Sequence, residues 1–301
     1  MRSLGVETVG GLFVALASFL FGGIVVTGKT VTNRGVDVSV MLSIRFAVAA
    51  VVLAMLLAMT GRPLRAARGE ASRLIALGVF GYAVEALFFF FAVERGTATS
   101  VTLLFFTYPV LVTLLAIALG LGRPRAIVVG ALLAATTGTA IVVGASGDLG
   151  ISSAGVAFAL GSAGMFALYL IGAEVGVRRT ASLAAALYVS AAAAVGLGVY
   201  ALATGGRAPA AFDEWWRIIV MGVFTAGAFF FLFAGLRALG AVRTSIVAAL
   251  EPLSTTVLAV GFLGETLHAS TIGGGMLILA GAVTASVARA RRRADLEAPV
   301  P

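Results

Sequence analysis

Long apolar stretches, separated by short polar or glycine-containing segments, follow one another from residue 9 almost to the end of the chain. A helix needs about 20 apolar residues to cross the hydrocarbon core of a bilayer. Ten stretches approach or exceed that length: 9–28, 38–59, 74–93, 99–119, 127–143, 151–174, 182–202, 216–236, 242–263 and 271–287. The segments between them are too short for a soluble domain. The pattern therefore predicts an all-α integral membrane protein with ten transmembrane helices.

The apolar pattern starts again half-way along the chain, which indicates an internal repeat. A shift of about 144 residues places Gly155 and Ser162 on Gly11 and Ser18, and a shift one residue smaller places Pro252 on Pro109. We expect a first five-helix repeat over residues 1–147, a second over 148–288 and a basic, disordered tail over 289–301. Because five is odd, the second repeat enters the membrane upside down. Inverted repeats around a central site are typical of secondary transporters that work by alternating access.

Composition agrees with a membrane protein. Of 301 residues, 60% are hydrophobic and only 11% are charged, which lies outside the range of soluble domains. The formal charge of +8 does not indicate nucleic-acid binding, because the basic residues lie between apolar spans and form no patch interleaved with aromatic residues. The chain has no cysteine, so disulfides and cysteine metal sites are excluded.

The basic residues instead predict the orientation in the membrane. Fifteen lie on one side of the predicted topology and five on the other, while Arg45 falls within a span. The richer side includes both ends of the chain, so we expect both termini in the cytoplasm. Trp215 and Trp216 fall at the outer interface, where indole rings are common. The basic tail is expected to contact anionic lipids.

A proline near the middle of the fourth span, Pro109, is matched by Pro252 in the ninth. Proline removes a helical hydrogen bond and kinks the helix. Interrupted helices at corresponding places of two repeats indicate a transporter binding site. A single proline is adequately explained as a packing kink, but the symmetric pair favours a hinge or cavity role.

Three charged residues fall within predicted spans: Arg45, Glu85 and Glu251. Each costs about 2.5–3.5 kcal/mol within the bilayer and so needs a partner or a wet cavity. Helical rise places Arg45 and Glu85 at similar depths, about 10 and 12 Å from the outer surface, which allows an ion pair or a shared cavity lining. The alternative is that Arg45 extends outward along apolar neighbours. Glu251 can bind a substrate amine, carry a proton or bond to the backbone at the kink, and its counterpart Tyr108 is uncharged.

Helical spacing gathers further candidates around these charges. They are Tyr82, Thr102, Phe105, Tyr108, Ser162, Tyr169 and Ser245. For the two serines, hydrogen bonding between helices is the simpler interpretation. The runs Phe88–Phe91 and Phe229–Phe231 wrap around their helices, which predicts that most of these rings face lipid.

Sequence signatures of catalysis are missing. His268 is the only histidine and has no companions at metal-ligand spacing. The chain contains no nucleophile elbow, nucleotide-binding phosphate loop or zinc-protease motif. We therefore expect no enzymatic activity, no metal and no cofactor, and transport driven by diffusion or by coupling to an ion or proton.

Several motifs resemble a known family. Leu250-Glu251-Pro252-Leu253, 262–267 and 273–278 in the second half, with Arg45-Phe46-Ala47 and Tyr108-Pro109-Val110 in the first, are similar to the EamA family of the drug/metabolite transporter superfamily. The overall character is closest to its YddG-type amino-acid exporters. The resemblance implies ten helices in inverted repeats, a bacterial inner membrane and export of small metabolites. Residues 122–125 depart from the pattern, because they lack the acidic residue that Glu265 supplies in the second half.

The expected function is export of small metabolites, amino acids foremost, by a monomer in contact with membrane lipids. A carrier of nucleotide- or lipid-linked sugars is the alternative within transport, although such a substrate would call for more cationic residues than Arg45. A non-transport membrane enzyme and a structural protein are the remaining readings; the first lacks catalytic groups, and the second does not explain charges at mid-membrane.

Overall fold

The computed structural model describes residues 2–61, 63–119, 150–248 and 250–281, with positions 130, 133, 134, 137, 138, 141 and 284. The side chains of residues 2–7, 113, 116, 242, 243, 245 and 246 are excluded from that description. Most of the predicted fifth helix, residues 122–125 and the tail therefore lie outside the described residues, as does the side chain of Ser245.

All the regular structure in the described ranges is helical. The elements are α1 (Arg2–Thr32), α2 (Val38–Met59), α3 (Ala71–Ala76), the π-helix η1 (Leu77–Tyr82), α4 (Ala83–Glu94), α5 (Ala98–Phe105), α6 (Tyr108–Ala118), α8 (Ser153–Gly176), α9 (Ser182–Thr204), α10 (Phe212–Val247) and α11 (Leu250–Leu263), and a further helix Ala269–Gly281. Six helical segments within the described residues are long and apolar enough to cross a membrane. The predicted all-helical membrane class is confirmed, whereas the count of ten helices stays a prediction.

Polar side chains cap the first turns of several of these helices. Asp37 accepts a hydrogen bond from the backbone N–H of Ser39 at the start of α2. Thr97 does the same for Ser100 at the start of α5, and Ser152 for Gly155 at the start of α8. Each cap satisfies a donor that the helix leaves unpaired, so helix starts are set locally within an apolar chain.

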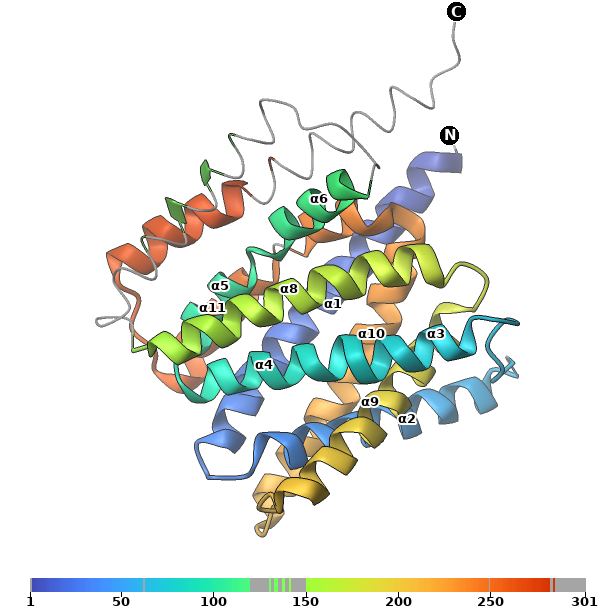
Figure 1. Cartoon of the computed structure of the whole chain (residues 1–301), viewed down its shortest axis with the longest axis horizontal. Helices are drawn as coiled ribbons and strands as arrows, with labels where there is room; N and C mark the ends of the chain where they lie inside the picture. The colour runs from blue at the N-terminus through green and yellow to red at the C-terminus, as the bar shows by residue number, and fades with distance from the viewer. Residues whose placement is uncertain are drawn as a thin grey trace, which may run out of the picture.

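Helices from the two halves of the chain pack against each other. α1 packs on α10 and α11, α2 on α9 and α10, and α4 and α5 on α8. Figure 1 shows α3, η1 and α4 as one continuous rod beside α8. The interior of the bundle is therefore largely an interface between first-half and second-half helices.

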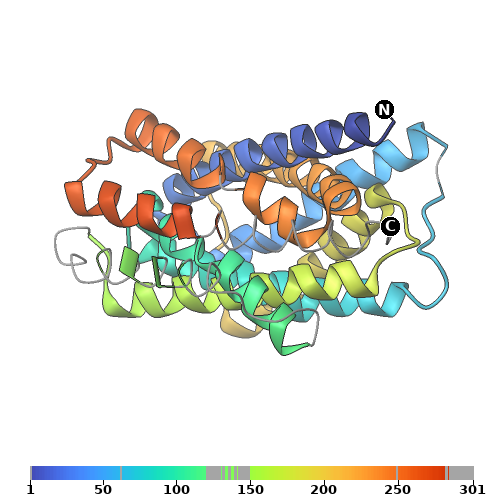
Figure 2. The same cartoon turned by 90° about the horizontal axis from the view of Figure 1, so that it is seen from above.

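Loops gather at the two ends of the bundle, as the side view in Figure 2 shows. We call the end that holds the N-terminus and residues 60–70 the N-terminal face, and the end that holds residues 33–37, 95–97, 205–211 and 264–268 the opposite face. By the charge pattern of the sequence, the N-terminal face is predicted to be cytoplasmic.

At the N-terminal face, Glu70 joins the two halves. Its carboxylate accepts hydrogen bonds from the backbone N–H groups of Arg178, Arg179 and Thr180, and from the Thr180 hydroxyl at 2.6 Å. Burial alone raises the pKa of the Glu70 carboxyl, but these hydrogen bonds outweigh it and hold the pKa at about 2. Glu70 is therefore ionised at neutral pH and fixes the loop before α9.

At the opposite face, three side-chain contacts fix the ends of helices; the first lies within the first half, and the other two join the two halves. Lys29 donates to the carbonyl oxygens of Val93 and Gly96 at 2.6 and 2.9 Å, at the end of α4. Arg34 forms an ion pair with Asp213 at the start of α10. The third contact is made by the Glu265 carboxylate, which accepts from the backbone at the start of α5. Both ends of the bundle are thus joined across the two halves.

Two of the spans are interrupted, and each interruption precedes a proline by a few residues. α5 ends at Phe105 and α6 begins at Tyr108. In the second half, α10 ends at Val247 and α11 begins at Leu250. Pro109 and Pro252 lie in the first turn of the following helix, where a missing N–H removes no helical bond. The predicted kinks are therefore helix breaks, at equivalent positions of the two halves.

Two departures from ideal helix geometry were not predicted. η1 is a π-helix in the middle of the third span, a form that is rare and is often found at functional sites. Gly240, with φ 76° and ψ 165°, turns the chain sharply inside α10. That conformation is essentially restricted to glycine, and it separates the predicted eighth and ninth spans.

Candidate functional site

A cavity of about 30 Å³ lies inside the bundle. Residues from α1, α2, η1, α4, α5, α8 and α11 line it: Phe21, Ile24, Val25, Arg45, Tyr82, Glu85, Ala86, Phe89, Phe90, Phe105, Phe166 and Glu251. The volume is enough for about two water molecules. The lining combines first-half and second-half residues, because the halves interdigitate here.

All three charged residues that the sequence places within the membrane line this one cavity. Arg45, Glu85 and Glu251 are 2%, 4% and 7% exposed and come from α2, α4 and α11. Among the described residues, no ion pair within 4.0 Å involves any of them. The arrangement matches the predicted shared lining rather than a direct Arg45–Glu85 pair, and Arg45 does not extend to the surface.

The Arg45 guanidinium rests on aromatic rings. Its central carbon lies 4.3 Å from the centroid of the Phe46 ring and 5.6 Å from that of Phe90. The buried Nε atom has no hydrogen-bond partner among the described residues. Cation–π contact partly replaces water around the charge, but a buried donor without an acceptor is costly. Arg45 is therefore positioned to bind an anionic group that enters the cavity.

Close helix approach brings Arg45 to this position. A Cβ atom at Gly222 of α10 would lie 2.9 Å from the Arg45 carbonyl oxygen, closer than real side chains allow. The glycine lets α2 pack directly on the α10 backbone, as small residues commonly do between membrane helices.

Glu85 is held by a neighbouring helix. The Ser162 hydroxyl of α8 donates a 3.0 Å hydrogen bond to its Oε1 atom. Ser162, from the second half of the chain, therefore orients the carboxyl group of Glu85, a first-half residue that lines the cavity. Tyr82 is the last residue of the π-helix and Glu85 lies three residues after it, so the π-helical turn sets their direction relative to α3.

Glu251 lies in the first turn of α11, where the helix dipole favours a carboxylate. No hydrogen bond from a described side chain reaches its carboxyl group. Its repeat counterpart Tyr108 also lies in a first turn, that of α6, and is buried. Tyr108 packs edge-on against Phe166 at 4.8 Å between ring centroids but does not line the cavity.

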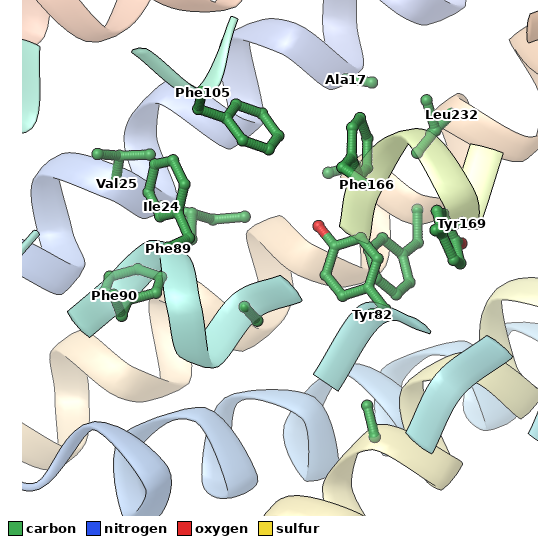
Figure 3. Close-up of a cluster of buried hydrophobic side chains, with 14 of the residues drawn as sticks. Ala17, Ile24, Val25, Tyr82, Phe89, Phe90, Phe105, Phe166, Tyr169 and Leu232 are labelled. Carbon is green, nitrogen blue, oxygen red and sulfur yellow. The ribbon is translucent and has the colours of Figure 1, made fainter. Parts of the chain in front are cut away.

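The apolar side chains in and around the cavity lining are largely aromatic, and Figure 3 shows them within the buried hydrophobic cluster. Phe89, Phe90 and Phe105 lie on one side with Ile24 and Val25, and Phe166, Tyr82 and Tyr169 lie on the other. The Tyr82 hydroxyl points into the space between the two groups. The Tyr82 ring packs on those of Phe229 at 4.5 Å and Tyr169 at 5.1 Å.

The prediction that the phenylalanine runs mostly face lipid is wrong for the residues nearest the cavity. Phe89, Phe90 and Phe229 are buried, and the first two line the cavity. Phe88 and Phe91 are partly buried and contact Phe158 of α8. The error arose because an aromatic run wraps around its helix and gives no signal of which rings face inward.

The remaining predicted residues take supporting positions. Tyr169 contacts the rings of Tyr82 and Phe166, and its buried hydroxyl has no partner among the described residues. Thr102 of α5 is buried with its hydroxyl likewise unpartnered, outside the cavity lining. Of the predicted candidates, Arg45, Tyr82, Glu85, Phe105 and Glu251 line the cavity.

The prediction missed Phe166, Phe21 and the aliphatic pair Ile24 and Val25. Phe166 lies four residues after Ser162 and three before Tyr169, so helical spacing from those two candidates would have found it. Phe21 and Ile24 carry no comparable signal, since α1 is apolar on every side.

The described residues include no group of three or more His, Cys, Asp or Glu side chains that could hold a metal ion. What the cavity offers is one guanidinium, two carboxyl groups and a phenolic hydroxyl within aromatic and aliphatic walls. This set of groups can bind a small molecule that carries both charges and an apolar part.

Comparisons with known proteins agree with this geometry. The sequence matches the model of the EamA-like transporter family over residues 8–144 and again over 153–287. One solved crystal structure has a similar fold, with a TM-score of 0.69 and 18% sequence identity over 94% of this chain and 99% of that chain. No curated protein matches the sequence significantly. Because the family model covers both halves of the chain, this multi-pass membrane protein belongs to the EamA-like transporter family.

Proposed function

We propose that the protein is a secondary transporter that exports amino acids across the bacterial inner membrane, by alternating access between two inverted five-helix repeats. The observation that carries the proposal is the central cavity, where Arg45, Glu85 and Glu251 meet between the two halves of the chain. In this proposal, both termini lie in the cytoplasm.

The charges of the cavity fit a zwitterion. Arg45 has an unpartnered Nε donor and is the group that binds the substrate carboxylate. Glu251 is assigned the substrate ammonium, because its carboxyl group accepts no hydrogen bond from a described side chain. Glu85 is already bonded to Ser162 and balances the charge of Arg45. The apolar walls accommodate an apolar side chain.

A nucleotide- or lipid-linked sugar fits the same cavity poorly. Such substrates carry one or more phosphate groups, and the described lining offers them a single guanidinium, that of Arg45. Its two carboxyl groups add no positive charge with which a phosphate could pair. The charge balance therefore favours amino acids over the alternative that the sequence left open.

Conformational change is required for any substrate to enter. A cavity of about 30 Å³ is too small for an amino acid, so the helices around it must separate at one face at a time. Each of the interrupted spans, α5–α6 and α10–α11, consists of two helical segments that meet at a break. One segment lies near the cavity, and the other extends towards one end of the bundle. Bending at these breaks is the proposed movement.

Uptake by proteoliposomes tests the proposal. Purified protein is reconstituted, and uptake of a panel of radiolabelled amino acids is measured with and without a pH gradient. We expect uptake of apolar amino acids that Arg45→Gln and Glu251→Gln both weaken. Arg178→Gln, which removes an exposed guanidinium that donates to the Glu174 carbonyl oxygen of its own segment, serves as control.

Two results would contradict parts of the proposal. If no amino acid is taken up while a nucleotide sugar is, the substrate class is wrong. If uptake is the same with and without the gradient, proton coupling through Glu85 or Glu251 is excluded and facilitated diffusion remains.

A further inference from the structure

A second cavity, of about 210 Å³, lies at the opposite face. It is bounded by the start of α5, by Gly150 and by the segment that joins α11 to the helix Ala269–Gly281. It is several times larger than the central cavity and has room for a molecule the size of a monosaccharide.

Among the described residues, the lining of this outer cavity carries hydroxyl groups and one imidazole but no charged side chain. The residues that supply them are Thr97, Thr99, Ser100, Thr266, His268 and Thr271. Hydroxyl groups and a neutral imidazole can both donate and accept hydrogen bonds. The cavity is therefore suited to a ligand that offers donors and acceptors in alternation.

The nearest carboxylate is already engaged. Glu265 accepts hydrogen bonds from the N–H groups of Ala98 at 2.6 Å and Thr99 at 3.1 Å, one with each oxygen. Its charge is thus offset by the positive end of α5. Neither the helix end nor Glu265 remains available to bind a charged ligand.

One hydroxyl group in the lining has no hydrogen-bond partner in the part of the chain that the structure describes. Thr99 is 3% exposed, and its Oγ1 atom forms no hydrogen bond with any described residue. Thr97 and Ser100 are instead bonded to each other at 2.9 Å, and Thr266 lies 3.4 Å from the His268 Nε2 atom. An unpaired buried hydroxyl destabilises the protein, and a ligand hydroxyl would relieve that cost.

We propose that the outer cavity binds an uncharged polyhydroxylated small molecule, of the class of monosaccharides and polyols. A zwitterion is excluded from this role, because its two charges would lose hydration without meeting an opposite charge. The ligand bridges α5 and the helix Ala269–Gly281, which supply Thr99 and Thr271. This site is separate from the central cavity and does not depend on the amino-acid proposal.

Saturation-transfer NMR tests the proposal, with the full chain in lipid nanodiscs free of glycoside detergents and D-glucose as probe. We expect glucose to receive saturation from the protein. Thr99→Val and Thr271→Val should each weaken glucose binding about fivefold or more, as loss of one hydrogen bond of about 1 kcal/mol predicts. Thr99→Ser keeps the hydroxyl group and should keep binding.

Thr255→Val is the matched control. Thr255 is also buried, and its hydroxyl is also unpartnered, but it lies on α11 outside the outer cavity. Glucose binding that survives both Thr99→Val and Thr271→Val would overturn the proposal, as would the absence of any glucose signal. Leucine binding that is lost in Thr99→Val would show an amino-acid site instead. Thermal unfolding of each variant without ligand separates lost binding from misfolding.

Discussion

Arg45 illustrates how a single residue can be unfavourable for stability and useful for binding. Its guanidinium is buried against Phe46 and Phe90, without an ion pair to a described residue and with an unpartnered Nε. The nearby Glu85 carboxyl balances part of its charge, but burying two such groups costs about as much as their mutual attraction returns. Retention of such a group is explained if a substrate carboxylate is its partner for part of the transport cycle.

The first prediction concerns Arg45→Gln. Loss of charged hydrogen bonds worth about 1.5–3 kcal/mol should raise the KM for amino-acid uptake by about 10- to 150-fold. The temperature of thermal unfolding should stay the same or rise, because the buried charge is gone. Arg45→Lys should also be impaired, since an ammonium group lacks the planar pair of donors.

Arg178→Gln is the control for this experiment. Its guanidinium is exposed and donates to the Glu174 carbonyl oxygen four residues earlier, so it lies in neither the cavity nor a contact between the halves. An unchanged KM in Arg45→Gln, or a lowered unfolding temperature together with lost uptake, would argue against the binding role.

The second prediction concerns Glu70 and pH. The pKa of its carboxyl is depressed in the folded protein, from an ordinary 4.5 to about 2. The stabilisation that it provides is therefore complete above pH 4.5 and is lost as the pH falls towards 2. Glu70→Gln should lower the free energy of unfolding by about 2 kcal/mol at pH 7, and the difference from wild type should shrink over that pH range.

Thermal unfolding in detergent from pH 7 to pH 2 measures this difference. Arg179→Gln is the control, because its guanidinium is 70% exposed and 3.6 Å from Glu70, whereas its backbone N–H remains in place. We expect a pH profile close to that of wild type. A profile like that of Glu70→Gln would instead assign the effect to the ion pair.

Among the elements, the two interrupted spans stand out because each contains a break that precedes a proline. A proline in the first helical turn stabilises the break, because its ring fixes φ at a helical value and because it has no N–H with which to continue a helix from the preceding segment. The sequence predicted special geometry at Pro109 and Pro252. It did not predict separate helices, because one missing hydrogen bond is compatible with either a kink or a break.

The third prediction tests these breaks. Pro109→Ala and Pro252→Ala should each cost about 0.4–1 kcal/mol of stability through the unfolded state, while the uptake rate falls about fivefold or more because the two half-helices can join. Pro209→Ala, in the loop before α10, should show the stability cost without the loss of uptake. If all three variants transport equally, the breaks have no role in movement.

At the scale of the whole molecule, the contacts between the halves divide into two sets, one at each face. Glu70 joins the halves at the N-terminal face, and Glu265 with the Arg34–Asp213 pair joins them at the opposite face. Alternating access requires that one set separates while the other persists. Exposed positions at each face can report on this directly.

The fourth prediction uses spin labels at introduced cysteines, which are unique because the chain has none. Asn33→Cys with Leu267→Cys reports on the distance between the halves at the opposite face, and Ala118→Cys with Val175→Cys on that distance at the N-terminal face. Pulsed electron paramagnetic resonance should show the two distances changing in opposite directions when substrate is added. Distances that increase together, or do not change, would contradict alternating access.

The membrane class, most helix positions, the two prolines and the three intramembrane charges all follow from the amino-acid sequence. These features are local, because helix length and the cost of a buried charge depend on residues close together in the chain. The meeting of Arg45, Glu85 and Glu251 in one cavity depends instead on the packing that places α2, α4 and α11 around it. Helices that are apolar on all sides do not encode which side faces inward. Close contacts such as that at Gly222, the π-helical turn that ends at Tyr82 and the packing of the two halves set those directions.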